Sequence, residues 1–302
     1  MNGQGKLLTH FLKNADKLVI PVYQRNYDWK EEHCKKLYSD LVKTIRDNKR
    51  WHFFGGIVSV SDPMGSSSDY LVIDGQQRIT TVSLLLLAIA NLIKASLVTP
   101  NDPNLYDVIT KKYLVDEINP KQRKVKLKPI KGDQDAYDRL WGDSSEYNFN
   151  SRITQNYLFF YNQIQREEIS VDQLFAAVEK LQIIDITLTP PDDDPQLVFE
   201  SLNSTGLDLN EGDKIRNFVL MRRSIEEQEQ FYDNYWSPIE KNAGYDKQTN
   251  SYDVSPFIRD YLGIKERRLT AMKEIYQEFK DYVEKRGQIE EVLKELRDYA
   301  KR

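Results

Sequence analysis

The residues best suited to chemistry form the pentapeptide Asp74-Gly75-Gln76-Gln77-Arg78. The apolar run before it predicts a short strand, and the long apolar run after it predicts a helix to about Ser96. The first turn of a helix has unpaired backbone N–H groups and partial positive charge, so it can bind an anion. Gly75 would let a phosphate approach the backbone, and Arg78 would add a guanidinium suited to phosphate oxygens.

The polar residues around this turn could complete an anion site. Gln76 and Gln77 can orient a water or a ribose hydroxyl, while Thr80 and Thr81 place hydroxyls near the same helix end. The alternative is an ordinary helix start, capped by the preceding acid and followed by an exposed arginine. Spacing alone favours neither interpretation, because short motifs often arise by chance.

A second candidate segment is 21–29, PVYQRNYDW, in which aromatic side chains interleave with Gln24 and Arg25. An aromatic face such as that of Tyr23 can stack on a base, and Arg25 can meet a phosphate. On these residues alone the favoured alternative is an aromatic cluster that covers the core.

A third candidate segment runs from residue 199 to 217. Asn203 and Gly206 suit a turn with left-handed backbone, and Lys214 lies near the start of a helix whose other face is apolar. An ordinary helix–loop–helix corner explains the same pattern and is preferred when the segment is taken alone.

A basic stretch from Lys111 to Lys131 contains the alternation Lys124-Val125-Lys126-Leu127-Lys128. This pattern is typical of a half-exposed strand with a charged outer face. Lys124, Lys126 and Lys128 could therefore follow a DNA backbone. They could equally protect an edge strand against aggregation, which is the interpretation we prefer.

Composition narrows the class of protein. The 302 residues are 40% hydrophobic and 30% charged, which predicts a globular chain of one large or two modest domains. The net charge of −4 means that DNA binding would need a local basic patch. The single cysteine, Cys34, excludes a disulfide framework and a cysteine-based zinc site. The three histidines, His10, His33 and His52, exclude a histidine-dependent nuclease centre from the C-terminal half.

Targeting signals are not evident in the sequence. The N-terminus lacks the apolar core of a signal peptide, and the most apolar run, Val82 to Ile93, is shorter than the roughly 20 residues that span a bilayer. Together with the cysteine usage, this predicts a cytoplasmic protein with no membrane contact.

The elements that would position these residues indicate an α+β fold. Strands are expected at 19–22, 53–60, 70–73, 124–129 and 181–188, with the second and third forming a hairpin. Helices are expected at 30–50, from the pentapeptide to 96, from Pro195 to 202, and at 210–223. From residue 224 the sequence becomes strongly charged and helical. We therefore expect a domain over 1–223, with helical insertions at about 95–180, and a helical region over 224–302.

Taken in order, the segments resemble the N-terminal domain of GmrSD-type restriction endonucleases, which is related to the ParB/sulfiredoxin-like fold. The resemblance covers about residues 10–225 and implies a small mixed sheet with surrounding helices. The matching pieces are Ile20-Pro21-x-Tyr23-Gln24-Arg25-x-Tyr27-x-Trp29, Phe54-Gly55-Gly56-Ile57-Val58, Val72-Ile73-Asp74-Gly75-Gln76-Gln77-Arg78-Ile79-Thr80-Thr81, Phe199-Glu200-x-Leu202-Asn203-x-x-Gly206-x-x-Leu209, and then Asp213, Arg216 and Asn217.

The resemblance implies a nucleotide-binding and nucleotide-hydrolysing sensor domain in a modified-DNA restriction system that defends against phage. In that family a separate nuclease domain, typically of the His-Asn-His kind and C-terminal, cleaves DNA. No histidine follows His52 here. Either the sequence is part of a longer chain, or the nuclease is another polypeptide, or this protein does not cleave DNA.

We therefore expect a nucleoside triphosphatase that uses Mg²⁺. Arg78 and the amides of residues 76–79 would hold phosphates, and Arg25 would reach the same phosphates. Asp74 would bind Mg²⁺ or orient the attacking water, with help from Gln77. Further nucleotide contacts are expected from Tyr23, Gln24, Gly75, Gln76, Thr80, Thr81, Asn203, Gly206 and Lys214.

Two other functions fit the sequence. The first is a ParB-like module whose DNA binding is switched by nucleotide without turnover. The second is a scaffold for DNA or protein whose helical C-terminal part carries the binding surface. The expected partners are a nucleotide, modified DNA and a nuclease domain or subunit outside this sequence, and the protein could also form oligomers.

Overall fold

The computed structural model describes residues 2–61, 69–116, 124–166, 168–190, 192–203, 209–221, 223, 225–246 and 251–301. The chain forms two compact units. Unit 1 consists of Met1–Pro21 and Asn26–Asp193, and unit 2 consists of Val22–Arg25 and Asp194–Arg302. The chain thus enters unit 2 for residues 22–25 and then returns to unit 1.

Unit 1 is built on a mixed sheet of six strands in the order β1-β8-β3-β4-β2-β7. The two central strands, β3 and β4, form an antiparallel pair, whereas β3 and β8 are parallel. β2 runs parallel to both β4 and β7. The strands are β1 (Asn2–Leu7), β2 (Lys17–Val19), β3 (His52–Ser61), β4 (Asp69–Asp74), β7 (Leu127–Lys128) and β8 (Leu181–Leu188). A separate pair consists of β5 (Val115–Asp116) and β6 (Lys124–Val125).

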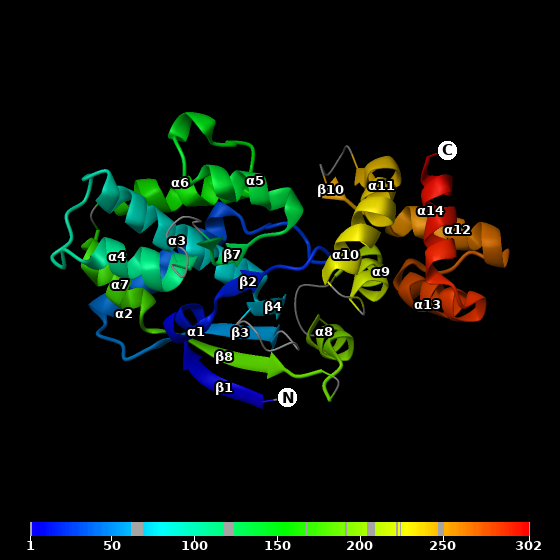
Figure 1. Cartoon of the computed structure of the whole chain (residues 1–302), viewed down its shortest axis with the longest axis horizontal. Helices are drawn as coiled ribbons and strands as arrows, with labels where there is room; N and C mark the ends of the chain where they lie inside the picture. The colour runs from blue at the N-terminus through cyan, green and yellow to red at the C-terminus, as the bar shows by residue number, and fades with distance from the viewer. Residues whose placement is uncertain are drawn as a thin grey trace. The chain divides into compact units, whose positions relative to one another are not determined.

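Helices pack against this sheet, and Figure 1 shows α3, α4, α5 and α6 together on one side of the strands. α6 packs directly on α3, and α7 packs on α2. The helices of unit 1 are α1 (Leu8–Asn14), α2 (Glu31–Arg46), α3 (Gln76–Lys94), α4 (Leu105–Ile109), α5 (Lys131–Arg139), α6 (Arg152–Ile164) and α7 (Val171–Val178).

The central helix α3 is buried on every side. Leu84, Leu85, Leu86 and Leu87 are all 0% exposed, as a helix that is apolar all round requires. By length and composition alone α3 could cross a membrane, but 83% of that stretch is buried inside the protein, as expected of a core helix. Burial of α3 fixes the position of its first turn, where the candidate site begins.

Unit 2 is mainly helical. Its helices are α8 (Pro195–Asn203), α9 (Glu211–Leu220), α10 (Ile225–Phe231), α11 (Ser237–Ile239), α12 (Ser255–Glu266), α13 (Ile275–Arg286) and α14 (Ile289–Ala300). Two single π-helical turns, Tyr232–Trp236 and Glu240–Gly244, flank α11. A short hairpin joins β9 (Tyr245–Asp246) and β10 (Ser251–Tyr252).

The expected α+β class with a helical C-terminal region is confirmed. The hairpin, the strand over 181–188 and the long helix after the pentapeptide are also present. The boundary expected at 223/224 lies within unit 2, because the chain leaves unit 1 at Asp193. The relationship to the ParB/sulfiredoxin-like fold remains an expectation from the resemblance.

Candidate functional site

The pentapeptide forms the tight strand-to-helix turn that the sequence predicts. β4 ends at Asp74, Gly75 has a left-handed φ of +93°, and α3 begins at Gln76. A Cβ atom on Gly75 would lie 3.0 Å from Cγ1 of Ile57 and 3.1 Å from the carbonyl oxygen of Gly56. Backbone strain and close packing therefore both require glycine here.

Because the residue before α3 is a glycine, no side chain caps the helix. The first N–H groups of α3 thus lack the side-chain oxygen that Ser, Asp or Asn would supply. An anion held at this helix end would take the place of that missing cap.

The side chain of Arg78 lies across the Gly55–Gly56 backbone of β3. Its Nη1 donates to the carbonyl oxygen of Gly56 at 3.0 Å and lies 3.8 Å from Oδ2 of Asp74. A Cβ atom on Gly55, where φ is +123°, would come within 2.6 Å of Nε of Arg78. Gly55 thus makes room for the arginine, and Gly56 supplies the carbonyl oxygen that accepts its hydrogen bond. With 32% of its side chain exposed, Arg78 can still reach a ligand.

Gln77 is committed to contacts within unit 1. Its Oε1 accepts hydrogen bonds from the backbone N–H groups of Asp28, at 3.0 Å, and Trp29, at 3.2 Å. Its Nε2 donates to the carbonyl oxygen of Asn26 at 3.2 Å. The side chain is 9% exposed, so this amide holds a neighbouring segment in place.

The two threonines of the motif lie inside the protein. Thr81 is 0% exposed, and its hydroxyl contacts the Tyr27 hydroxyl and the carbonyl oxygen of Gln77, both at 2.7 Å. Thr80 is buried beside Gln76, and both line a cavity of about 10 Å³, room for about one water. The described contacts therefore favour a structural role for Thr81.

Asp133 lies close to the turn, and the sequence analysis did not single it out. It lies in the first turn of α5, lines the same small cavity, and accepts a 2.6 Å hydrogen bond from the backbone N–H of Tyr27. Burial raises the pKa of its carboxyl to about 6, although the hydrogen bond from Tyr27 acts in the opposite direction. An acid in the first turn of a helix is common, so the local sequence gave no signal.

Several expected nucleotide contacts belong to unit 2. Tyr23 and Gln24 are buried, and Arg25 is half-buried. Lys214 pairs with Glu211 at 2.6 Å. Asn203 ends α8 but its side chain, like the whole of Gly206, lies outside the described residues. The joint action of these residues with the pentapeptide stays a prediction.

Arg216, a matched residue without an assigned role, is the centre of a polar network within unit 2. Its guanidinium contacts Asp213 at 2.8 Å, Glu240 at 2.9 Å and the carbonyl oxygen of Tyr23 at 2.9 Å. Nε1 of Trp236 also donates to Glu240 at 2.8 Å. Arg216 is 8% exposed, so loss of any one partner would leave an uncompensated charge inside the unit.

The lysine pattern over 124–128 is not one strand with three outward lysines, and this expectation is corrected. The chain bends at Lys126, so β6 pairs with β5 while β7 joins the edge of the main sheet. Lys126 is 6% exposed, and its ammonium donates to the carbonyl oxygens of Leu12, Lys13 and Lys112 at 3.0–3.2 Å. Lys128 is exposed on the edge strand, whereas the Lys124 side chain lies outside the described residues.

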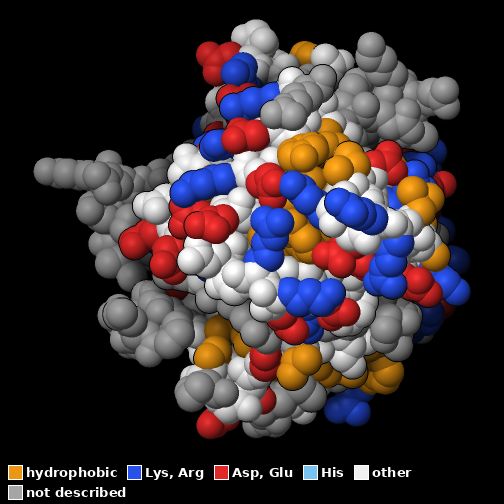
Figure 2. All heavy atoms as spheres, turned by 90° about the vertical axis from the view of Figure 1, so that its right-hand side faces the viewer, with side chains coloured by type: hydrophobic (Ala, Val, Ile, Leu, Met, Phe, Trp, Pro, Cys, Tyr) orange, Lys and Arg blue, Asp and Glu red, His pale blue; other side chains and the backbone are white. Residues whose placement is uncertain are grey.

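On the face where Figure 1 labels α12, α13 and α14, the charged side chains of the described residues are of both signs. Figure 2 shows Lys and Arg interspersed with Asp and Glu across that face. A surface for a DNA backbone would instead concentrate positive charge. This face therefore gives no support to DNA binding by the C-terminal helices.

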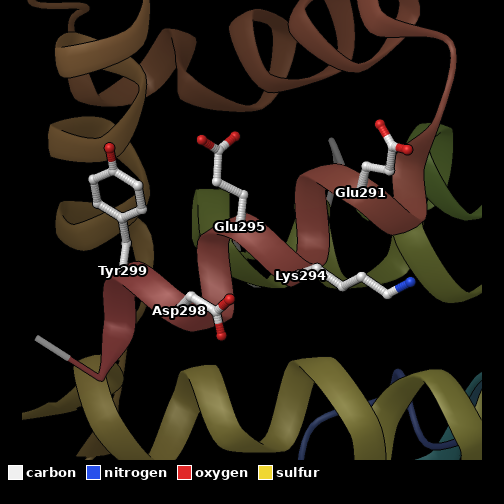
Figure 3. A pocket seen from close by; sticks show the side chains of 5 residues that line it. All are labelled: Glu291, Lys294, Glu295, Asp298 and Tyr299. Carbon is white, nitrogen blue, oxygen red and sulfur yellow. The ribbon is translucent and has the colours of Figure 1, made fainter.

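A groove of about 510 Å³ runs along α14. Figure 3 shows Glu291, Glu295 and Tyr299 pointing to one side of the helix, while Lys294 and Asp298 point away. Glu295 is already bonded by Tyr261, at 2.9 Å, and by Lys265. The lining groups do not converge, so this groove is not a candidate active site.

The expected Mg²⁺ can be tested against its donors. Among the described residues, no three His, Cys, Asp or Glu side chains gather as a metal cluster. Asp74 offers one carboxylate that is 41% exposed. Mg²⁺ in phosphoryl-transfer sites is held by one or two carboxylates together with substrate phosphates and waters. Asp74 therefore fits a metal that is shared with a nucleotide.

The fold and this turn define the class of protein. A mixed sheet carries an Asp-Gly-Gln-Gln-Arg turn into a buried helix, and an arginine lies over paired glycines. The family model described as "GmrSD restriction endonuclease, N-terminal domain" matches residues 8–220. Because this match covers more than half of the chain, the protein belongs to that family and is a domain of a restriction system. A search of curated proteins finds no match.

Proposed function

We propose that this chain is the nucleotide-binding and NTP-hydrolysing sensor domain of a system that restricts modified DNA. The observation that carries the proposal is the position of Arg78, held over Gly55 and Gly56 beside the uncapped first turn of α3. The guanidinium and the helix amides would bind phosphate oxygens from two directions.

Charge neutralisation and positioning are the main tasks in phosphoryl transfer, so no covalent nucleophile is needed. Arg78 and the amides of residues 76–78 would hold phosphates, and Asp74 would hold Mg²⁺ or orient the attacking water. The amide of Ile79, which was also expected at the phosphates, instead donates to the carbonyl oxygen of Gly75 at 3.0 Å. When bound, Mg²⁺ would neutralise phosphate charge. Tyr23, Gln24, Arg25, Asn203 and Lys214 belong to unit 2, so the proposal is argued from the residues of unit 1 alone.

A nucleotide switch without turnover is the second candidate. It is favoured by Gln77, whose amide makes three hydrogen bonds to residues 26, 28 and 29 and is buried, which leaves it little access to an attacking water. In either case the bound nucleotide would regulate contact with modified DNA and a nuclease domain or subunit. Since DNA restriction takes place where the cell keeps its DNA, we place the protein in the cytoplasm.

The test is to incubate the purified protein with each NTP and Mg²⁺, and to measure both phosphate release and nucleotide binding by calorimetry. Arg78→Ala should weaken binding at least tenfold. Arg50→Ala is the matched control, because Arg50 is exposed and makes no hydrogen bond or ion pair with a described residue of unit 1.

The outcomes separate the candidates. Phosphate release that Arg78→Ala abolishes and Arg50→Ala leaves intact supports the hydrolase. Binding without release selects the switch. If the wild type neither binds nor hydrolyses any NTP, both candidates are wrong.

A further inference from the structure

The segment Asn26–Trp29, called here the strap, has no regular secondary structure, yet side chains bond its backbone at successive residues. The N–H of Tyr27 donates to Asp133 at 2.6 Å. The next two N–H groups, of Asp28 and Trp29, both donate to Oε1 of Gln77. Three consecutive backbone donors are therefore bonded by two side chains.

The carbonyl side of the strap is held in the same way. Gln77 donates to the carbonyl oxygen of Asn26 at 3.2 Å, and Nδ2 of Asn156 donates to that of Trp29 at 2.7 Å. Nδ2 of Asn156 also donates to the Tyr27 hydroxyl at 2.9 Å, and the same hydroxyl contacts Thr81. The strap is thus fixed through both its backbone and its buried tyrosine.

The three side chains that hold the strap come from three different helices of unit 1. Gln77 is on α3, Asp133 on α5 and Asn156 on α6, with exposures of 9%, 8% and 1%. Burying polar side chains costs free energy unless they are hydrogen-bonded. The hydrogen bonds to the strap satisfy these three side chains inside the core. Gly132 adds to this arrangement, because a Cβ atom there would lie 2.8 Å from Oδ1 of Asn26.

The strap also reaches the proposed phosphate site. Tyr27 and Asp133 line the small cavity together with Gln76, Gln77 and Thr80 of the first turns of α3. Gln77 is the second residue of that helix. Because Gln77 bonds the strap three times, any movement of the strap would be transmitted to the turn that carries Arg78.

We propose that Asp133 and Asn156 are positioning residues for the phosphate site: they fix the strap, and the strap fixes the first turn of α3 through Gln77. This inference rests on the proposed function. It assigns Gln77 to positioning rather than to orienting the attacking water. A fixed first turn keeps its N–H groups and Arg78 in one arrangement, so that little ordering is needed when phosphate binds.

Matched variants at one helix test the inference. Asp133→Ala removes the acceptor for the Tyr27 N–H, whereas Asp133→Asn keeps an oxygen of similar shape. Asp135→Ala is the control, because Asp135 lies on the exposed face of α5 and pairs only with Arg139 among the described residues. Two readouts are used: hydrogen exchange of the strap amides, and the Kd and kcat for the NTP that the wild type binds.

For Asp133→Ala we expect strap amides to exchange at least tenfold faster and the nucleotide Kd to rise about tenfold, with a smaller change in kcat. Asp133→Asn should restore both values to within about threefold of the wild type, and Asp135→Ala should change neither. Unchanged exchange in Asp133→Ala overturns the inference, as does faster exchange with unchanged Kd. A wild type that binds no NTP is a different result, because it removes the proposed function while the exchange data still report on the strap.

Discussion

The guanidinium of Arg78 lies against Gly55, so closely that a methyl group on Gly55 would come within 2.6 Å of its Nε atom. Gly55 also has a φ of +123°, which side-chain-bearing residues rarely adopt. The glycine at position 55 is thus explained by the arginine that lies against it. Gly55 is as much a part of the candidate site as the arginine.

The first prediction follows from this contact. Gly55→Ala should displace Arg78 and strain the backbone, at a cost of roughly 1–3 kcal/mol in unfolding free energy. Nucleotide affinity should fall about tenfold, which calorimetry would measure. Gly56→Ala is the control, because the nearest atom to a Cβ there is 3.9 Å away. Equal affinity in the two variants would show that the position of Arg78 does not matter for binding.

The second prediction concerns pH and Asp133. Burial raises its folded-state pKa from 3.8 to about 6, so the neutral carboxyl is favoured in the folded state. This pKa shift contributes to the free energy of unfolding. The contribution is fully present below about pH 4 and is lost as pH rises through about 6. Since one pKa unit corresponds to about 1.4 kcal/mol, the loss is on the order of 3 kcal/mol.

Asp133→Asn cannot ionise and isolates this effect. Its unfolding free energy relative to the wild type should increase between pH 4 and pH 7, as measured by urea unfolding at several pH values. A difference between the two proteins that is constant over this range would contradict the assigned pKa.

The third prediction concerns Lys126. Lys126→Met would remove a buried ammonium that bonds the carbonyl oxygens of Leu12, Lys13 and Lys112. Unfolding free energy should fall by roughly 2–3 kcal/mol, because buried acceptors lose a charged donor. Urea unfolding measures this loss. Lys36→Met, at an exposed position of α2, should change stability by less than about 0.5 kcal/mol.

The fourth prediction concerns Arg216. Arg216→Ala would leave Asp213 and Glu240 without their common partner inside unit 2. Removing one member of a buried ionic network typically costs about 3–5 kcal/mol, and thermal unfolding would reveal it as a lower Tm. Arg259→Ala, at a surface pair with Asp260, should have little effect. A small effect at both positions would mean that solvent replaces the lost contacts of Arg216.

The sequence predicted those parts of the fold whose signal is local. The strand over 181–188 has an apolar, β-branched run, and the helix after Gly75 is unusually apolar, so both were found. β1, with the polar sequence NGQGKL, was not found, because its position is set by backbone pairing with β8 far along the chain. Val19–Val22 was expected to form a strand, but β2 is Lys17–Val19, since Pro21 has no N–H for the sheet.

The same distinction applies to the candidate site. The turn at Gly75 is encoded locally and was predicted together with Arg78. The contacts of Asp133 and Asn156 were not, because each joins residues more than a hundred positions apart. Lys126 is a case in which the local pattern was misleading. The alternating pattern predicted an exposed side chain, but the chain bends between two short strands and the Lys126 side chain points into the core.

The four residues Val22–Arg25 have a consequence for how the protein is made. Tyr23 leaves the ribosome early, yet Arg216, which bonds its carbonyl oxygen, follows 193 positions later. The second unit therefore cannot complete its interior until the chain has been synthesised past Arg216. For the same reason, a gene fragment that starts at residue 194 would encode a unit 2 without its own N-terminal residues, and proteolysis between the units would not release it intact.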